Sequence, residues 1–177
     1  MNSGKELGAD PTSGPTSAFR VATSADAGAI CSIYNPYIRD TVVTFEEEAV
    51  TEAAMQQRLA AIGSKFPWLV AELGGGIVGY AYATEWRSRS AYRHSVETTV
   101  YLASDCCGKG LGTALYRELI ERLRPGGFHR AIGGIALPNE ASVALHEKLG
   151  FRKVAHLTEV GRKFGRWIDV GYWELAL

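Results

Sequence analysis

The chain has 177 residues, a length that corresponds to about one domain. Its composition, 46% hydrophobic and 21% charged residues, is ordinary for a globular protein and excludes wholesale disorder. Nineteen basic residues balance nineteen acidic residues, which excludes a nucleic-acid binder that relies on a bulk positive field.

The cysteines and histidines give no sign of a metal site or a disulfide framework. The three cysteines are an odd number, and neither a C-x-x-C pair nor a histidine ligand spacing occurs. No apolar run approaches the ~18 residues that a membrane span requires, and the N-terminus lacks the apolar core of a signal peptide. We therefore expect a cytoplasmic protein with no metal, no nucleic-acid partner and no membrane partner.

The chain begins with a stretch that differs in composition from the rest. Residues 1–17 are rich in Ser, Thr, Gly and Pro, which predicts a disordered tail ahead of one domain over residues 18–177. A short alternating strand is expected over residues 19–22. Thr23 and Asp26 have the spacing of a capping box, so a helix should follow them.

A proline, a helix cap and two runs of alternating apolar and polar residues predict the next elements. Pro36 should interrupt or kink the first helix, because proline has no N–H to donate. A second helix is expected over residues 51–62, with Thr51 as its cap. Two alternating runs, residues 68–72 and 77–83, are joined by three glycines and predict a β-hairpin.

Strands and helices alternate in the second half of the chain. Strands are expected over residues 96–102, 130–137, 151–159 and 167–175. One helix should run from the glycine-rich loop at residues 108–112 to Leu123, and another from the cap Asn139 to Leu149, with Val143, Ala144 and Leu145 inward. This order predicts an α/β protein with a mixed sheet and helices on both faces.

The glycine-rich loop is the first candidate for a binding site. It follows a strand and opens a helix, and free N–H groups at a helix N-terminus bind anions such as phosphate or pyrophosphate. The alternative is that the glycines only make a tight turn between strand and helix. The loop is not a P-loop, because no Lys-Ser/Thr pair follows its second glycine.

Several motifs together resemble a known family, the GNAT N-acetyltransferases. The strand at residues 96–102, the loop Gly108-Lys109-Gly110-Leu111-Gly112 and the helix from Asn139 to Gly150-Phe151 occur in that family's order. The resemblance covers residues 19–177 and is greatest to the phosphinothricin acetyltransferase branch. Four stretches resemble that branch: Ile33-Tyr34-Asn35 followed by Thr44-Phe45-Glu46-Glu47; Gly79-Tyr80-Ala81-Tyr82; Tyr92-Arg93 before Val96-Glu97; and Lys163 to Val170.

The resemblance implies a fold and a co-substrate. The fold would be a mixed, mostly antiparallel sheet with helices on both faces and a splayed central strand pair. The co-substrate would be acetyl-CoA, with its pyrophosphate at the helix N-terminus. The coenzyme contacts implied by the family are the backbone of Val100, Tyr101 and Leu102, the loop residues Gly108, Lys109, Gly110, Leu111, Gly112 and Thr113, and Asn139.

One loop position departs from the family pattern. Cys107 stands where the family usually has Gln or Arg, and a thiol does not supply the same donor to a pyrophosphate. The backbone N–H groups of the loop remain, so we expect a coenzyme site of reduced affinity.

Glu97 is the candidate general base. It lies within a β-branched, apolar strand, and burial raises the pKa of a carboxyl group. Acetylation of an amine needs a base, since an ammonium group has no lone pair with which to attack a thioester. The alternative is an outward-facing glutamate on a half-exposed strand.

His146 occupies the position at which many relatives carry a tyrosine that protonates the leaving thiolate. A histidine could do this if charged, or could hydrogen-bond near the sulfur. The alternative is a helix histidine that packs against the sheet. For the acceptor, the resemblance to this branch favours Arg87 as the carboxylate ligand, since arginine forms bidentate bonds to carboxylates. The alternative is that Arg87 belongs to an ordinary solvated basic loop. Phe45 and Trp86 are expected to wall the acceptor's side-chain pocket, or else to be ordinary core residues.

The resemblance favours one enzymatic function, with two alternatives. It implies an acetyltransferase that acts on the α-amino group of a small amino-acid analogue such as phosphinothricin, methionine sulfoximine or methionine sulfone. The alternatives are a protein or peptide N-terminal acetyltransferase and a non-catalytic acyl-CoA-binding sensor. The segment at residues 163–170 resembles a dimer contact of this branch, so a homodimer is expected.

Overall fold

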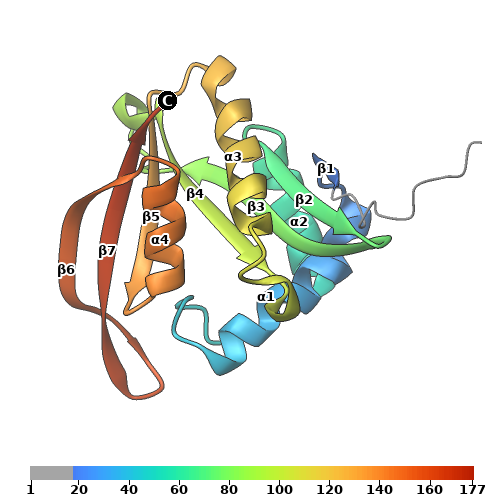
Figure 1. Ribbon diagram of the computed structural model, residues 1–177, viewed down its shortest axis with the longest axis horizontal. Coiled ribbons are helices and arrows are strands. Elements are labelled where there is room, and N and C mark those ends of the chain that lie inside the picture. The colour runs from blue at the N-terminus through green and yellow to red at the C-terminus, as the bar shows by residue number, and fades with distance from the viewer. Residues whose placement is uncertain (1–17) are drawn as a thin grey trace, which may run out of the picture.

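The computed structural model describes residues 18–177, which contain a seven-stranded sheet in the order β1-β2-β3-β4-β5-β7-β6 (Figure 1). The tail predicted over residues 1–17 lies outside the described residues. The strands are β1 (Ala18–Val21), β2 (Trp68–Leu73), β3 (Gly76–Glu85), β4 (Ser95–Leu102), β5 (Arg130–Leu137), β6 (Arg152–Lys163) and β7 (Arg166–Ala176). The α-helices are α1 (Ala27–Asp40), α2 (Glu52–Gly63), α3 (Leu111–Leu123) and α4 (Glu140–Lys148).

Helices cover both faces of the sheet, as the sequence predicts. In β2, Trp68 and Val70 pack in one apolar cluster with α1 and α2, whereas Leu69 and Ala71 pack in a second cluster with α3. Successive side chains of a strand point to opposite faces, so this fully apolar run belongs to a strand that is buried on both sides. Figure 1 shows α3 and α4 in front of the sheet and α1 and α2 behind it.

The two central strands diverge. β4 and β5 form the parallel pair of an otherwise antiparallel sheet, and their pairing covers only residues 95–97 against residues 130–132. β4 continues to Leu102 and β5 to Leu137 without further pairing between them. The splayed strand pair implied by the family is therefore confirmed, and the gap begins immediately after Glu97.

The predicted helix caps are present. The Thr51 hydroxyl accepts a hydrogen bond from the Ala54 N–H at 3.2 Å, and the Asn139 side-chain oxygen accepts from the Ser142 N–H at 3.1 Å. The Thr23 N–H donates to the Asp26 carboxylate at 2.7 Å, which completes the expected capping box. These local signals fix where each helix begins and therefore how it meets the sheet.

The structure corrects two local predictions. Of the two outcomes expected at Pro36, an interruption of the first helix is contradicted, because α1 continues through it to Asp40. Ile38, in the turn after Pro36, is only 1% exposed, and this burial opposes the cost of the missing N–H. In α4, Ala144 is exposed, whereas the sequence predicted it to face the sheet, and His146 is buried. Residues three apart lie on the same face of a helix, so Val143 and His146 face the sheet together while Ala144 lies on another face.

Candidate active site

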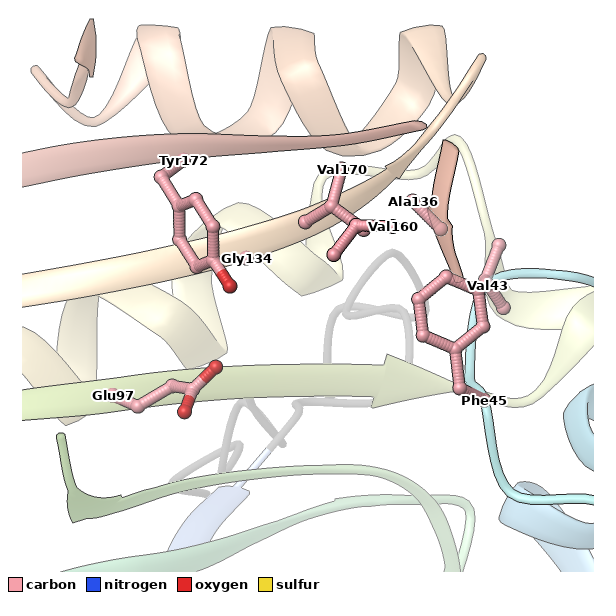
Figure 2. A pocket seen from close by; sticks show the side chains of 8 residues that line it. All are labelled: Val43, Phe45, Glu97, Gly134, Ala136, Val160, Val170 and Tyr172. Carbon is pink, nitrogen blue, oxygen red and sulfur yellow. The ribbon is translucent and has the colours of Figure 1, made fainter. Parts of the chain in front are cut away.

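A cavity of about 280 Å³ lies beside the gap between β4 and β5. Residues of β4, β5, β6, β7 and the loop between α1 and α2 line it: Val43, Phe45, Glu97, Gly134, Ala136, Val160, Val170 and Tyr172. Figure 2 shows the Glu97 carboxylate and the Tyr172 hydroxyl toward one end, and Val43 and Phe45 at the other. The cavity is therefore polar at one end and apolar at the other.

Glu97 points into this cavity and not outward. Burial raises the pKa of its carboxyl group, and the nearby Arg87 guanidinium partly opposes that rise. Within residues 18–177 no side chain donates a hydrogen bond to the carboxylate, so its oxygens remain available to a ligand. A side chain at Gly134 would come within 3.4 Å of one Glu97 oxygen, so the glycine keeps the space beside the carboxylate open.

Arg87 and Trp86 lie behind the polar end of the cavity. Trp86 packs edge-on against Tyr172 with 5.3 Å between ring centroids, and the Arg87 guanidinium lies 4.7 Å from the Trp86 ring centroid. Neither side chain lines the cavity itself. Arg87 is exposed, and its positive charge lowers the pKa of Glu97, so it lies close enough to act on the polar end of the cavity.

Phe45 lines the apolar end of the cavity. Its ring lies where a side chain at Gly161 of β6 would be, since a Cβ there would collide with three ring atoms. The loop that carries Phe45 is fixed on its other side by Glu46, which accepts two hydrogen bonds from Arg58 at 2.7 and 3.0 Å. The position of Phe45 thus depends on both α2, which carries Arg58, and β6, which carries Gly161.

The glycine-rich loop forms an open cradle at the start of α3. Gly108 and Gly110 have positive φ angles of 76° and 80°, a conformation that favours glycine, and a Cβ at either position would meet no other atom within 4 Å. Gly110 is the N-cap of α3 and has no capping side chain. The first N–H groups of a helix have no partner within the helix. Those of Leu111, Gly112 and Thr113 are therefore available to an anion, and the loop fits a pyrophosphate.

The end of β4 lies beside this cradle. Val100, Tyr101 and Leu102 pair with β3 but not with β5, so one edge of this segment is free of strand partners. The carbonyl of Leu102 already accepts a hydrogen bond from the Tyr37 hydroxyl at 2.7 Å. The remaining candidate contacts lie at the borders of the gap: Lys109, whose ammonium donates to the Asp105 carbonyl at 2.9 Å, and Asn139, which caps α4.

His146 is placed as a packed histidine rather than as a charged acid. It is 5% exposed, it does not line the cavity, and burial lowers its pKa. Its Nδ1 lies 2.8 Å from the Ser142 carbonyl and its Nε2 lies 3.1 Å from the Tyr116 hydroxyl. The neutral ring satisfies both contacts by donating from Nδ1 and accepting at Nε2. Of the two alternatives drawn from the sequence, the geometry favours packing against the sheet.

Sequence reasoning did not identify the cavity residues on the C-terminal strands. Val170 and Tyr172 lie on the same face of β7, as residues two apart on a strand must. Gly134 was visible in the sequence as a glycine within a predicted strand, which indicates close approach of another group. Val160 carried no usable signal, because its position depends on an irregularity in β6.

No group of three or more His, Cys, Asp or Glu side chains in residues 18–177 is placed to hold a metal ion. No helix in the same range is long and apolar enough to cross a membrane.

A half-buried carboxylate of raised pKa lies beside a cavity, and a helix N-terminus with free N–H groups follows the same strand, an arrangement that suits an enzyme with a phosphate-bearing substrate. Comparison with known proteins identifies which kind. The acetyltransferase (GNAT) domain model matches residues 19–171, and the chain belongs to this family of acetyltransferases.

Two relatives and one solved structure show how close the similarity is. Phosphinothricin N-acetyltransferase of Streptomyces viridochromogenes is 41% identical over 156 residues, which cover 88% of this chain and 85% of that enzyme. L-methionine sulfoximine/L-methionine sulfone acetyltransferase of Pseudomonas paraeruginosa is 38% identical, with coverage of 92% and 95%. The phosphinothricin acetyltransferase of Sinorhizobium meliloti, solved in complex with AcCoA, has a TM-score of 0.88 and 38% identity, with coverage of 92% and 89%.

Proposed function

We propose that this acetyltransferase moves the acetyl group of acetyl-CoA to the α-amino group of a small amino-acid analogue of the phosphinothricin, methionine sulfoximine or methionine sulfone type. The observation that carries the proposal is the Glu97 carboxylate, to which no side chain of residues 18–177 donates a hydrogen bond, at the polar end of a cavity with an apolar far end. The cavity volume of about 280 Å³ suits a small molecule.

The chemistry follows from the positions of the side chains. Glu97 accepts one proton from the acceptor's ammonium group, and the freed lone pair forms a bond to the acetyl carbon. The nitrogen loses its second proton to solvent or to the departing thiolate as the carbon–sulfur bond breaks. A raised pKa brings the carboxylate closer to the operating pH, which favours this proton transfer. The role of Arg87 is to bind the acceptor's carboxylate, and the role of the cradle at residues 108–113 is to bind the pyrophosphate of acetyl-CoA.

His146 has a supporting role in this proposal. Its neutral ring orients the Tyr116 hydroxyl, which also contacts the Thr98 hydroxyl at 2.6 Å, one residue beyond Glu97. The thiolate of CoA leaves without an acid from the protein, since a thiol of ordinary pKa is a tolerable leaving group.

Two alternatives predict other behaviour. A peptide N-terminal acetyltransferase needs a groove open to a continuing chain, whereas Phe45 and Val160 stand at the far end of this cavity. A non-catalytic acyl-CoA sensor does not need a base, yet Glu97 faces the cavity. Release of CoA should be measured with methionine sulfone, with phosphinothricin and with short peptides. Release with the amino-acid analogues supports the proposal, release only with peptides refutes it, and binding of acetyl-CoA with no release identifies a sensor.

We further propose that the chain forms a cytoplasmic homodimer through β6 and the turn that follows it. β6 is the edge strand of the sheet, and several large apolar side chains of this hairpin outside the cavity lining are exposed: Val154, Leu157, Phe164 and Trp167. An exposed edge with apolar side chains favours association. Sedimentation at two concentrations tests this, and a monomer at both refutes it.

A further inference from the structure

β6 contains a wide irregularity beside the cavity. Leu157 pairs with Val170 and Gly161 pairs with Ile168, so residues 158–160 of β6 lie opposite Asp169 alone. Glu159, in the middle of this bulge, has a φ angle of 51°, which is uncommon for a residue other than glycine. Such a conformation persists only where the surroundings hold it.

Asp169 on β7 holds the bulge through both carboxylate oxygens. Its Oδ1 accepts a hydrogen bond from the Glu159 N–H at 2.8 Å, and its Oδ2 lies 2.7 Å from His156 Nε2, which donates to it. The Asp169 carboxylate thus contacts β6 at two residues, His156 before the bulge and Glu159 within it. Asp169 does not line the cavity itself.

The bulge carries the residues that form the apolar end of the cavity. Val160, the last residue of the bulge, lines the cavity. Gly161 follows it and accepts the Phe45 ring in the space that a side chain would fill. Two residues further, Lys163 is 2% exposed and its ammonium donates to the Thr44 carbonyl at 2.8 Å. Through these contacts at Gly161 and Lys163, the conformation of β6 determines the position of the loop that carries Phe45.

We propose that Asp169 is a positioning residue for acceptor selectivity: by holding the bulge in β6, it sets how far Val160 and Phe45 close the apolar end of the cavity. The inference rests on the proposed function, because it assigns the apolar end to the acceptor's side chain. The acceptors favoured by this arrangement are α-amino acids whose unbranched side chain ends in a small apolar group, which reaches Val160 and Phe45.

The test compares two acceptors that share the α-amino acid group but differ in side-chain length: methionine sulfone and 2-aminobutyrate. In Asp169→Ala the ratio of kcat/KM for the long acceptor to that for the short one should fall by about tenfold, the lower end of what one lost methylene contact costs. Asp169→Asn keeps an oxygen that accepts from the Glu159 N–H, so its ratio should stay near that of the wild type. The KM for acetyl-CoA should not change in either variant.

Glu174→Ala is the matched control. Glu174 is a carboxylate on the same strand, paired with Arg152 at 3.8 Å and outside the cavity lining. Its removal should leave the acceptor ratio unchanged. If Asp169→Ala also leaves the ratio unchanged, or if Glu174→Ala lowers it equally, Asp169 has no positioning role.

Amide hydrogen exchange tests the same coupling without an acceptor. In Asp169→Ala, exchange should accelerate at residues 158–161 and also at residues 43–46, whereas Glu174→Ala should leave both segments as in the wild type. Unchanged exchange at residues 43–46 in Asp169→Ala would overturn the inference. A wild-type protein that acetylates neither amino acid refutes the proposed function, and exchange at residues 43–46 then still decides whether Asp169 holds the cavity wall.

Discussion

Glu97 on β4 lies opposite Ile132 on β5 in the last backbone pair that joins the two central strands. The carboxylate is therefore fixed on a paired segment, while the strand beyond it is free along one edge. The Thr98 hydroxyl, one residue further, lies 3.3 Å from the Ile132 carbonyl and extends the join on the opposite face. The candidate base thus stands where rigid pairing ends and the gap begins.

Arg87 and Glu97 should be linked in the pH dependence of the reaction. Because the Arg87 guanidinium lowers the pKa of Glu97, its removal should raise that pKa further. Glu97 must be ionised to accept a proton, so the acidic limb of kcat/KM in Arg87→Ala should move to higher pH. The KM for the amino-acid acceptor should also rise by roughly ten- to a hundredfold, the worth of about 1.5–3 kcal/mol of charged hydrogen bonds.

Arg87→Lys is the control for charge. It keeps the positive charge but loses the planar fork, so its acidic limb should shift less while its acceptor KM remains raised. If the acidic limb of Arg87→Ala coincides with that of the wild type, Arg87 does not act on the catalytic carboxylate.

Gly110→Asp should weaken acetyl-CoA binding by at least about tenfold, since a carboxylate at the helix N-terminus opposes a pyrophosphate at short range. Gly110→Asn is nearly the same size and meets the same backbone strain at a φ of 80°, so the pair isolates the charge. Calorimetry measures the affinity, and thermal unfolding measures stability. Equal affinities of the two variants would remove the loop from the pyrophosphate site.

Cys107→Arg should strengthen acetyl-CoA binding by up to about fivefold, because an exposed ion pair is worth about 0.2–1 kcal/mol. Cys107 is exposed and directly precedes Gly108 of the cradle, so we expect an added guanidinium to reach a pyrophosphate bound there. Cys107→Ser adds no charge and should bind as the wild type does. An affinity for Cys107→Arg no higher than that of Cys107→Ser would show that this position does not face the coenzyme.

The sequence predicted the elements that local chemistry determines. The caps at Thr51 and Asn139 and the helix after the glycine-rich loop appear where side-chain and backbone preferences place them. Pro36 shows where such local reasoning fails, because the burial of Ile38 keeps the helix intact. The splayed strands came from the family resemblance, since no local pattern reports how far two strands stay paired.

The site was predictable in part for the same reason. Glu97 could be named as the candidate base because it is a charged residue in an apolar strand and because the family resemblance favours a base at that position. The packing of His146 could not be predicted, since a sequence does not show which hydroxyl a buried ring will meet. Val160 lines the cavity because of a bulge in β6 that Asp169 of β7 holds. This contact between two strands could not be predicted from the sequence of either strand alone.

The most direct test of the account is the rate of Glu97→Gln at moderate pH with acetyl-CoA saturating. Glutamine keeps the size of the side chain but does not accept the proton, and a positioned base contributes ~10²–10⁴-fold. The account predicts a fall in kcat/KM for the amino-acid acceptor within that range, with acetyl-CoA affinity unchanged and with the loss shrinking at high pH, where the free amine is already neutral. A variant that retains the wild-type kcat at moderate pH would contradict it and make Glu97 a structural residue.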